Sequence, residues 1–222
     1  MNRQIQVTED GSHTIALEDT GITYHSTHGA IQESLHVFIN AGLKPLLYKQ
    51  KTVHVFEMGF GTGLNALLSL QAALEFGDCV NYIAAEQFPL VTEEFELLNY
   101  CEVLKKKDLQ PYFTLMHAAH WGEDVYITPG FILHKIKQSV VNLTLPQQFD
   151  IIFFDAFAPA DQPELWTKDI FEKMYNMLEN GGVLVSYCSK GNVRRTLKAV
   201  GFNVEKLQGP PGKREITRAT KP

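Results

Sequence analysis

Three glycines at alternate positions are the first residues in this 222-residue chain whose type and spacing could do chemistry. Gly59, Gly61 and Gly63 follow an apolar run at residues 53–56 and open a second apolar run. A strand, a glycine turn and a helix bring backbone N–H groups close to a nucleotide, because glycine has no side chain to hold the ligand away. The spacing therefore predicts a nucleotide site.

Two acidic residues flank this turn and help to identify the nucleotide. Glu57 stands two residues before the first glycine, and Glu86 ends the next apolar run. The dinucleotide fingerprint GxGxxG requires a third glycine where this chain has Leu64. The form Glu-x-Gly-x-Gly-x-Gly instead resembles motif I of class I S-adenosylmethionine (SAM) methyltransferases, and Glu86 resembles their ribose-binding carboxylate. A dinucleotide site is one alternative, and ordinary turn glycines beside a surface acid are the other.

A third acid, Asp155, follows a continuous apolar run at residues 149–154. Such a run is typical of a strand buried on both faces, and open α/β sheets bind ligands at the carboxyl ends of their strands. An aliphatic amine titrates near ~10.4, so it arrives protonated, and a carboxylate beside it can orient the lone pair and accept the proton. We therefore predict Asp155 as the catalytic residue of methyl transfer to an amine. Its alternative is a helix N-cap or turn role.

The segment around Asp155 also carries a specific family resemblance. Residues 155–171, DAFAPADQPELWTKDIF, resemble the hallmark of the methyltransferase part of the bifunctional tRNA wobble-uridine enzymes of the MnmC family and their stand-alone relatives. The resemblance continues, in the same order, at residues 24–43, 56–68, 84–90 and 209–217. It therefore covers nearly the whole chain.

This resemblance implies a function. Members of the family use SAM to methylate the exocyclic amine of 5-aminomethyl-(2-thio)uridine at the tRNA wobble position. We thus expect SAM as cofactor, no metal and no flavin, tRNA bound through its anticodon region, no membrane contact and a cytoplasmic location. In the bifunctional form a flavin-dependent oxidase domain follows. This chain ends at Pro222, so the stand-alone form is expected.

The patterns and the resemblance together assign the site. The predicted cofactor-binding residues are Tyr24, Ser26, Glu57, Gly59, Phe60, Gly61, Thr62, Gly63, Asn65, Glu86, Gln87, Gln138, Ser139 and Asp155. The predicted substrate-binding residues are Phe157, Pro159, Trp166, Lys190, Arg194, Lys213 and Arg214. The chain departs from the family at residues 136–139, where Gln138 replaces an acid near the adenine. For Trp166 a packing role is the alternative.

The elements that position these residues alternate between strand and helix, which indicates a doubly wound parallel sheet. We expect a class I methyltransferase α/β fold with a seven-stranded, mostly parallel sheet and a reversed last strand. Residues 1–50 form a hairpin and a helix, capped at Ser26 or Thr27 and ended near Gly42, as an extension of a domain at residues 51–222. Residues 92–104 are expected to be one helix, residues 112–116 a strand, and residues 125–133 an inserted β-hairpin.

The charges are unevenly placed along the chain. The net charge is −5, which argues against indiscriminate nucleic-acid binding, yet residues 188–222 hold nine Lys or Arg against two Glu. This basic region can contact phosphates locally, and a solvated basic face is the alternative.

The three cysteines form no CxxC pair, which fits reduced thiols in a cytosolic protein. The pairs His25/His28 and His117/His120 lack further ligands, so no metal site is predicted.

Other functions remain open at this stage. One is a SAM-dependent methyltransferase of a small molecule or protein. A second is an aminopropyltransferase, which shares the fold but uses decarboxylated SAM. A third is a non-catalytic RNA-binding module.

Overall fold

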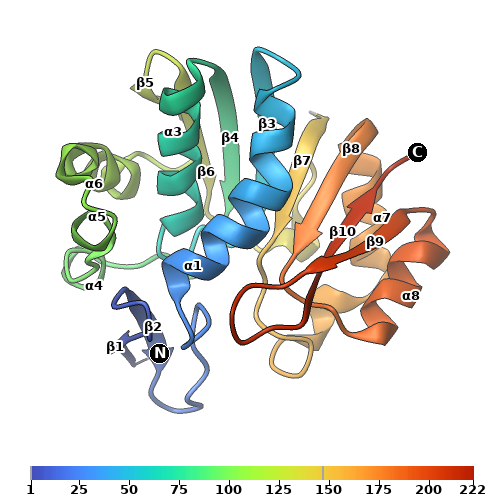
Figure 1. The fold of residues 1–222 in the computed structure, drawn as a ribbon, viewed down its shortest axis with the longest axis horizontal. Helices are drawn as coiled ribbons and strands as arrows, with labels where there is room; N and C mark the ends of the chain where they lie inside the picture. Colours follow the sequence, from blue (N-terminus) through green and yellow to red (C-terminus); the bar gives the residue numbers. More distant parts are fainter. Residues whose placement is uncertain (1, 147) are drawn as a thin grey trace.

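A computed structural model describes residues 2–146 and 148–222, and its centre is an eight-stranded sheet in the order β5-β6-β4-β3-β7-β8-β10-β9 (Figure 1). Its strands are β3 (Thr52–Met58), β4 (Cys79–Ala85), β5 (Asp124–Thr128), β6 (Phe131–Ile136), β7 (Phe149–Phe154), β8 (Leu178–Ser186), β9 (Asn203–Gln208) and β10 (Glu215–Thr220). The strands from β6 to β8 in this order are parallel, whereas β10 is antiparallel to both β8 and β9. The fold class and the reversed last strand are confirmed.

The strand count exceeds the prediction because the expected inserted hairpin is part of the sheet. β6 pairs in parallel with β4, Phe131 lying opposite Val80, and β5 adds an antiparallel edge strand. Residues 112–116, predicted as a strand, lie instead in the helix α6 (Gln110–Ala118), which has Pro111 in its first turn. Proline fits the first turn of a helix because the N–H it lacks has no partner there.

Helices cover both faces of the sheet (Figure 1). One face carries α1 (Ala30–Ser34), the π-helix η1 (Leu35–Leu43), α2 (Lys44–Leu47), α3 (Leu64–Phe76), α4 (Thr92–Phe95), α5 (Tyr100–Val103), the 3₁₀ turn η2 (Lys107–Leu109) and α6. The other carries the 3₁₀ turns η3 (Val140–Asn142) and η4 (Pro163–Trp166) with α7 (Lys168–Met177) and α8 (Gly191–Val200). Alternate strand residues serve opposite faces: Phe153 packs in the first core and Phe154 in the second.

The N-terminal helix differs from its prediction at both ends. It begins after Gly29, not at Ser26 or Thr27, and it continues through Gly42 to Leu47. A side chain at Gly42 would lie 2.9 Å from a methyl group of Ile151 and 3.1 Å from Val185, so glycine permits the helix to approach the sheet closely. Residues 92–104 also differ, since they form the two short helices α4 and α5 rather than one.

The predicted N-terminal hairpin is present as the separate ribbon β1 (Arg3–Val7) and β2 (His13–Leu17). Arg3 pairs with Glu94 at 3.0 Å, and the backbone N–H of His13 donates to the Asn99 side chain at 2.8 Å. The ribbon thus packs on the segment that carries α4 and α5. The domain boundary at residue 50 stays a prediction. In the described part of the chain, no helix is long and apolar enough to cross a membrane.

Candidate active site

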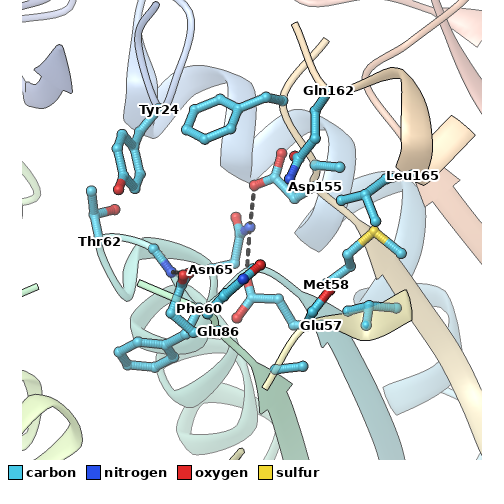
Figure 2. A pocket seen from close by; sticks show the side chains of 18 of the residues that line it. Tyr24, Glu57, Met58, Phe60, Thr62, Asn65, Glu86, Asp155, Gln162 and Leu165 are labelled. Atoms are coloured by element: carbon cyan, nitrogen blue, oxygen red, sulfur yellow. Dashed lines mark hydrogen bonds between the residues drawn. The ribbon is translucent and has the colours of Figure 1, made fainter. Parts of the chain in front are cut away.

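A pocket opens at the carboxyl ends of β3, β4 and β7 (Figure 2), where an open α/β sheet is expected to bind its ligand. Twelve of the fourteen predicted cofactor-binding residues line it: Tyr24, Glu57, Gly59, Phe60, Gly61, Thr62, Asn65, Glu86, Gln87, Gln138, Ser139 and Asp155. The two that do not are Ser26, which lines a neighbouring pocket, and Gly63. The sequence therefore predicted most of the residues that line this cavity.

The glycine turn between β3 and α3 has a backbone that only glycine adopts readily. Gly59, Gly61 and Gly63 have φ values of 92°, 50° and 73°. A Cβ at Gly61 would lie 3.2 Å from the Tyr24 ring, so its absence keeps the pocket open on that side. Gly63 directly precedes α3 and faces His117. A Cβ at Gly63 would lie 2.9 Å from His117 Nε2, so glycine at this position permits close packing.

Glu86 holds the glycine turn in place from the end of β4. Its Oε2 accepts a hydrogen bond from the Gly61 N–H at 3.0 Å, and its Oε1 accepts one from the Phe88 N–H at 2.7 Å. A carboxylate offers about four lone-pair sites, so Glu86 retains acceptor capacity toward the pocket. It has the position and chemistry needed to accept two hydroxyl donors of a ligand.

Asn65, in the first turn of α3, links two carboxyl groups (Figure 2). Its Nδ2 donates to Glu57 Oε1 at 2.9 Å and to Asp155 Oδ2 at 2.8 Å. Glu57 is 1% exposed, and burial raises its pKa well above the ordinary value despite the Asn65 hydrogen bond. Within the described residues, Glu57 Oε2 and Asn65 Oδ1 are buried without a hydrogen-bond partner. This cluster joins β3, α3 and β7 at the pocket floor.

Asp155 has the protonation behaviour of a proton acceptor. Burial raises its pKa from 3.8 to about 7 and Glu33 adds to the rise, while the Asn65 hydrogen bond and Lys213 oppose it. A carboxyl group with a pKa near the working pH is suited to general base catalysis. No helix begins at Asp155: β7 ends at Phe154 and the next helical turn, η4, starts at Pro163.

A second pocket adjoins the first and shares Tyr24, His25, Ala156 and Phe157 with it. Its other lining residues are Thr20, Gly21, Ile22, Thr23, Ser26, Thr27, Glu33, Ala158, Asp161, Tyr187 and Lys213. The rings of Tyr24 and Phe157 meet edge to face with centroids 5.2 Å apart, where the two pockets meet. A cofactor in one pocket and a substrate in the other would therefore meet near Asp155.

The predicted substrate-binding residues divide between this region and the outer surface. Phe157 and Lys213 line the second pocket. Trp166 is buried against Phe154 and donates its indole N–H to the Phe157 carbonyl at 2.8 Å, so it supports the pocket from behind. The remaining four line neither pocket: Pro159, Lys190, Arg194 and Arg214.

Sequence reasoning missed several lining residues of the first pocket: His25, Met58, Leu64, Ala85, Val140, Ala156, Gln162 and Leu165. Gln162 and Leu165 lie inside the motif at 155–171, which was the available signal. The missed apolar residues lie at the ends of strands, as Met58 and Ala85 do, or in helical turns, as Leu64 and Val140 do, and their pattern does not differ from that of core positions.

In each histidine pair one member is buried or half-buried, His25 in the first and His117 in the second. Within residues 2–146 and 148–222, no three His, Cys, Asp or Glu side chains lie close enough together to hold a metal ion. Burial lowers the pKa of both His25 and His117 to about 4, so both are neutral at pH 7. His117 stacks on Phe95 with centroids 4.3 Å apart, and its Nε2 lies 3.1 Å from the Thr62 carbonyl.

Comparisons with known proteins find similar sequences. Residues 116–222 match a family described as S-adenosyl-L-methionine-dependent methyltransferase. The chain is 28% identical over 97% of its length to the tRNA 5-methylaminomethyl-2-thiouridine biosynthesis bifunctional protein MnmC of Idiomarina loihiensis, of which it covers 38%. It is 30% identical over 96% of its length to the protein of that name from Actinobacillus pleuropneumoniae serotype 5b, of which it covers 34%. The chain is therefore similar to part of the MnmC proteins over nearly its whole length, and residues 116–222 match a SAM-dependent methyltransferase family.

Solved structures extend this result to the fold. The structure of MnmC2 from Aquifex aeolicus matches the whole chain with a TM-score of 0.81 at 27% identity, and 71% of that protein is covered. Spermidine synthase from Thermotoga maritima matches 99% of the chain with a TM-score of 0.60 at 16% identity, which shows a shared fold alone. The chain spans a little over a third of the length of the curated MnmC proteins that it matches.

Proposed function

We propose that this protein transfers a methyl group from SAM to the exocyclic amine of 5-aminomethyl-(2-thio)uridine at the wobble position of tRNA. The observation that carries the proposal is the position of Asp155, tied to Asn65 on the floor of one pocket and followed directly by Ala156 and Phe157, which line both pockets. The similarity to proteins named for 5-methylaminomethyl-2-thiouridine biosynthesis supports this choice of substrate.

The residues present fit SAM. The glycine turn lacks the side chains that would fill the pocket, and Glu86 has free acceptor sites for the two ribose hydroxyls. Glu57 Oε2 and Asn65 Oδ1 are buried acceptors without partners among the described residues, as expected beside a charged, amine-bearing ligand. Gln138, Ser139 and Gln87 line the side assigned to the adenine. When bound, SAM supplies an activated methyl group on a sulfonium centre.

The protein's own chemistry is to bind, align and deprotonate the amine. Asp155 accepts a hydrogen bond from the ammonium group, orients the nitrogen lone pair and receives the proton. Asn65 fixes the Asp155 carboxylate through Oδ2, which leaves Oδ1 for the substrate. Tyr24 and Phe157 narrow the passage between the pockets and hold the uracil ring in place.

Contacts to tRNA phosphates would come from the basic C-terminal region. Lys190 and Arg214 are exposed, whereas Arg194 pairs with Glu215 at 2.6 Å and Lys213 pairs with Glu33. We therefore assign phosphate contacts at the anticodon region first to Lys190 and Arg214. A tRNA substrate also implies a cytoplasmic location, which belongs to the same proposal.

The test is methyl transfer to defined substrates. Purified protein and labelled SAM are incubated with tRNA that carries 5-aminomethyl-uridine, with fully modified tRNA and with a protein and metabolite extract. We expect label only in the first, and nucleoside mass analysis should find 5-methylaminomethyl-uridine there. Label in the extract alone would favour a different methyltransferase, and consumption of decarboxylated SAM would favour an aminopropyltransferase. SAM that fails to raise the melting temperature would favour an RNA-binding module.

A further inference from the structure

Lys213 is held inside the site by two partners. Its ammonium group forms an ion pair with Glu33 and lies 4.1 Å from the centroid of the Tyr187 ring. Its side chain is 26% exposed and lines the second pocket. A cation fixed by both a carboxylate and an aromatic face is poorly available to a phosphate, so its role must be sought among its neighbours.

Glu33 belongs to α1 and is 6% exposed. Besides Lys213 it accepts a hydrogen bond from the Ser26 N–H at 3.2 Å, so one carboxylate joins the helix, the loop that lines the second pocket and the segment before β10. A buried carboxylate costs free energy unless it is paired. Removal of either partner therefore affects all three segments.

The connection continues to the catalytic residue through Tyr187. The Tyr187 hydroxyl donates to the Ala156 carbonyl at 2.8 Å, and Ala156 is the neighbour of Asp155. The segment that carries Lys213 is itself tightly built. The Lys213 N–H donates to the Pro210 carbonyl at 2.9 Å, and any side chain at Gly212 would collide with His28.

We propose that Glu33 and Lys213 form a positioning pair, which fixes Tyr187 and the segment after β7 and thereby sets the orientation and the charge state of Asp155. The charged and polar groups that interact with Asp155 are Glu57 from β3, Tyr82 from β4, Asn65 from α3, Glu33 from α1, Tyr187 after β8 and Lys213 before β10. Of the two members of the pair, Glu33 raises the pKa of Asp155 and Lys213 lowers it. The proposal depends on the proposed function at one point, which is the catalytic role of Asp155.

The test uses the full chain and the variants Glu33→Gln and Lys213→Met. Lys49→Met is the control for loss of a lysine charge, because Lys49 is exposed, follows α2 and lines neither pocket. The carboxyl ¹³C signal of Asp155, assigned by its loss in Asp155→Asn, is followed against pH by NMR. Turnover at saturating SAM is measured over the same pH range.

We expect the two variants to move the Asp155 titration in opposite directions, by roughly half a pH unit or more. Lys213→Met removes a cation and shifts it to higher pH, whereas Glu33→Gln removes an anion and shifts it to lower pH. The acidic limb of the turnover profile should follow, and Lys49→Met should change neither the Asp155 titration nor the turnover profile. Lys213→Arg, which keeps the charge, should retain most of the native titration.

Several results would overturn the pair. They are shifts of the Asp155 titration in the same direction in both variants, no shift in either, or an equal shift in Lys49→Met. If a variant fails to fold, Tyr187→Phe serves instead, because it removes only the hydroxyl that reaches Ala156, and an unchanged Asp155 titration and turnover in it would also overturn the proposal. The NMR titration needs no tRNA. If the wild-type protein is inactive but the Asp155 titration still shifts as expected in the two variants, the proposed function is contradicted and the positioning pair is retained.

Discussion

At the scale of single residues, Glu86 performs two tasks with one carboxylate: it holds the Gly61 and Phe88 N–H groups, and it faces the pocket. We expect Glu86→Ala to weaken SAM binding tenfold or more, because charge-assisted hydrogen bonds contribute about 1.5–3 kcal/mol. Isothermal calorimetry measures the change. Glu93→Ala, which removes an exposed acid at the start of α4, is the control. Unchanged SAM affinity in Glu86→Ala would contradict the assignment.

Asp155 leads to a prediction about rate. Asp155→Asn keeps the shape of the side chain but removes the proton acceptor, so turnover at neutral pH should fall by about 10²–10⁴-fold. Activity should recover in part as pH rises, because the solvent then supplies the neutral amine. The measurement is turnover against pH at saturating SAM and tRNA, with SAM affinity determined separately. Near-normal turnover at every pH would show that Asp155 serves only to hold Asn65.

At the scale of elements, the turn between β3 and α3 leads to a prediction with an internal control. Gly61 and Gly77 both have left-handed backbones, with φ values of 50° and 69°. Alanine costs about 1–2 kcal/mol in this conformation at either position. Only at Gly61 does the new methyl group meet a pocket residue, Tyr24 at 3.2 Å, since nothing lies within 4 Å at Gly77.

Both Gly→Ala variants should therefore lose a similar amount of stability in urea unfolding. Only Gly61→Ala should also lose SAM affinity in calorimetry. Equal SAM affinity in the two variants would show that the ligand does not approach the turn at Gly61.

The element scale also shows what the sequence could predict. Strands β3, β4 and β7 were predictable because a short, mostly apolar run between turn residues has few other interpretations. The π-helix was not, since its apolar pattern resembles that of an α-helix, and Gly42 looked like a stop signal although it serves close packing against Ile151. In α6, the short, largely apolar run at residues 112–116 was interpreted as a strand, and Pro111 was the overlooked signal of a helix start.

The site, like the fold, has features that could be predicted from local sequence and others that could not. Glycines and acids in a family-like order located the first pocket, because their chemistry is readable from type and spacing. The Glu33–Lys213 pair joins residues 180 positions apart in sequence, and only the fold brings them together. Lys213 was therefore interpreted as a phosphate ligand from its basic neighbourhood.

At the scale of the whole molecule, buried titratable groups make stability depend on pH in two opposing ways. His117 has a pKa of about 4 when folded against about 6.5 when unfolded, so the unfolded chain binds more protons and stability falls as pH drops from 7 to 5. Asp155 has a pKa raised from 3.8 to about 7, so the folded chain binds more protons than the unfolded chain. The contribution of Asp155 to stability therefore rises as pH drops from 7 to 5.

We expect two variants to change this dependence in opposite directions. Between pH 7 and pH 5, His117→Phe should remove roughly 2 kcal/mol of acid destabilisation, and Asp155→Asn should remove a stabilising contribution of similar size. Urea unfolding at pH 7, 6 and 5 measures both. A His117→Phe protein with the wild-type dependence would contradict a neutral, buried His117.

The uneven charge leads to a prediction about tRNA binding. Arg214→Glu should weaken tRNA binding and reduce the slope of log K against log salt by roughly one unit for each phosphate that the protein no longer neutralises. Lys49→Glu introduces the same charge change at an exposed position after α2, just before the first residues of β3 and thus far from the pocket. Affinity measured from about 50 to 300 mM salt, the range over which phosphate contacts weaken steeply, should separate the two. Identical slopes would remove Arg214 from the interface.

The order of the sheet has a consequence for synthesis. β10 lies between β8 and β9 although it follows both in the chain, so β9 has no neighbour to pair with until β10 has been made (Figure 1). Until then the free side of β8 exposes unpaired N–H and C=O groups, which are a template for pairing with other chains. A chain cut short between residues 208 and 215 would keep the strands β3, β4 and β7 that carry the pocket, whereas its sheet would stay open to aggregation at β8.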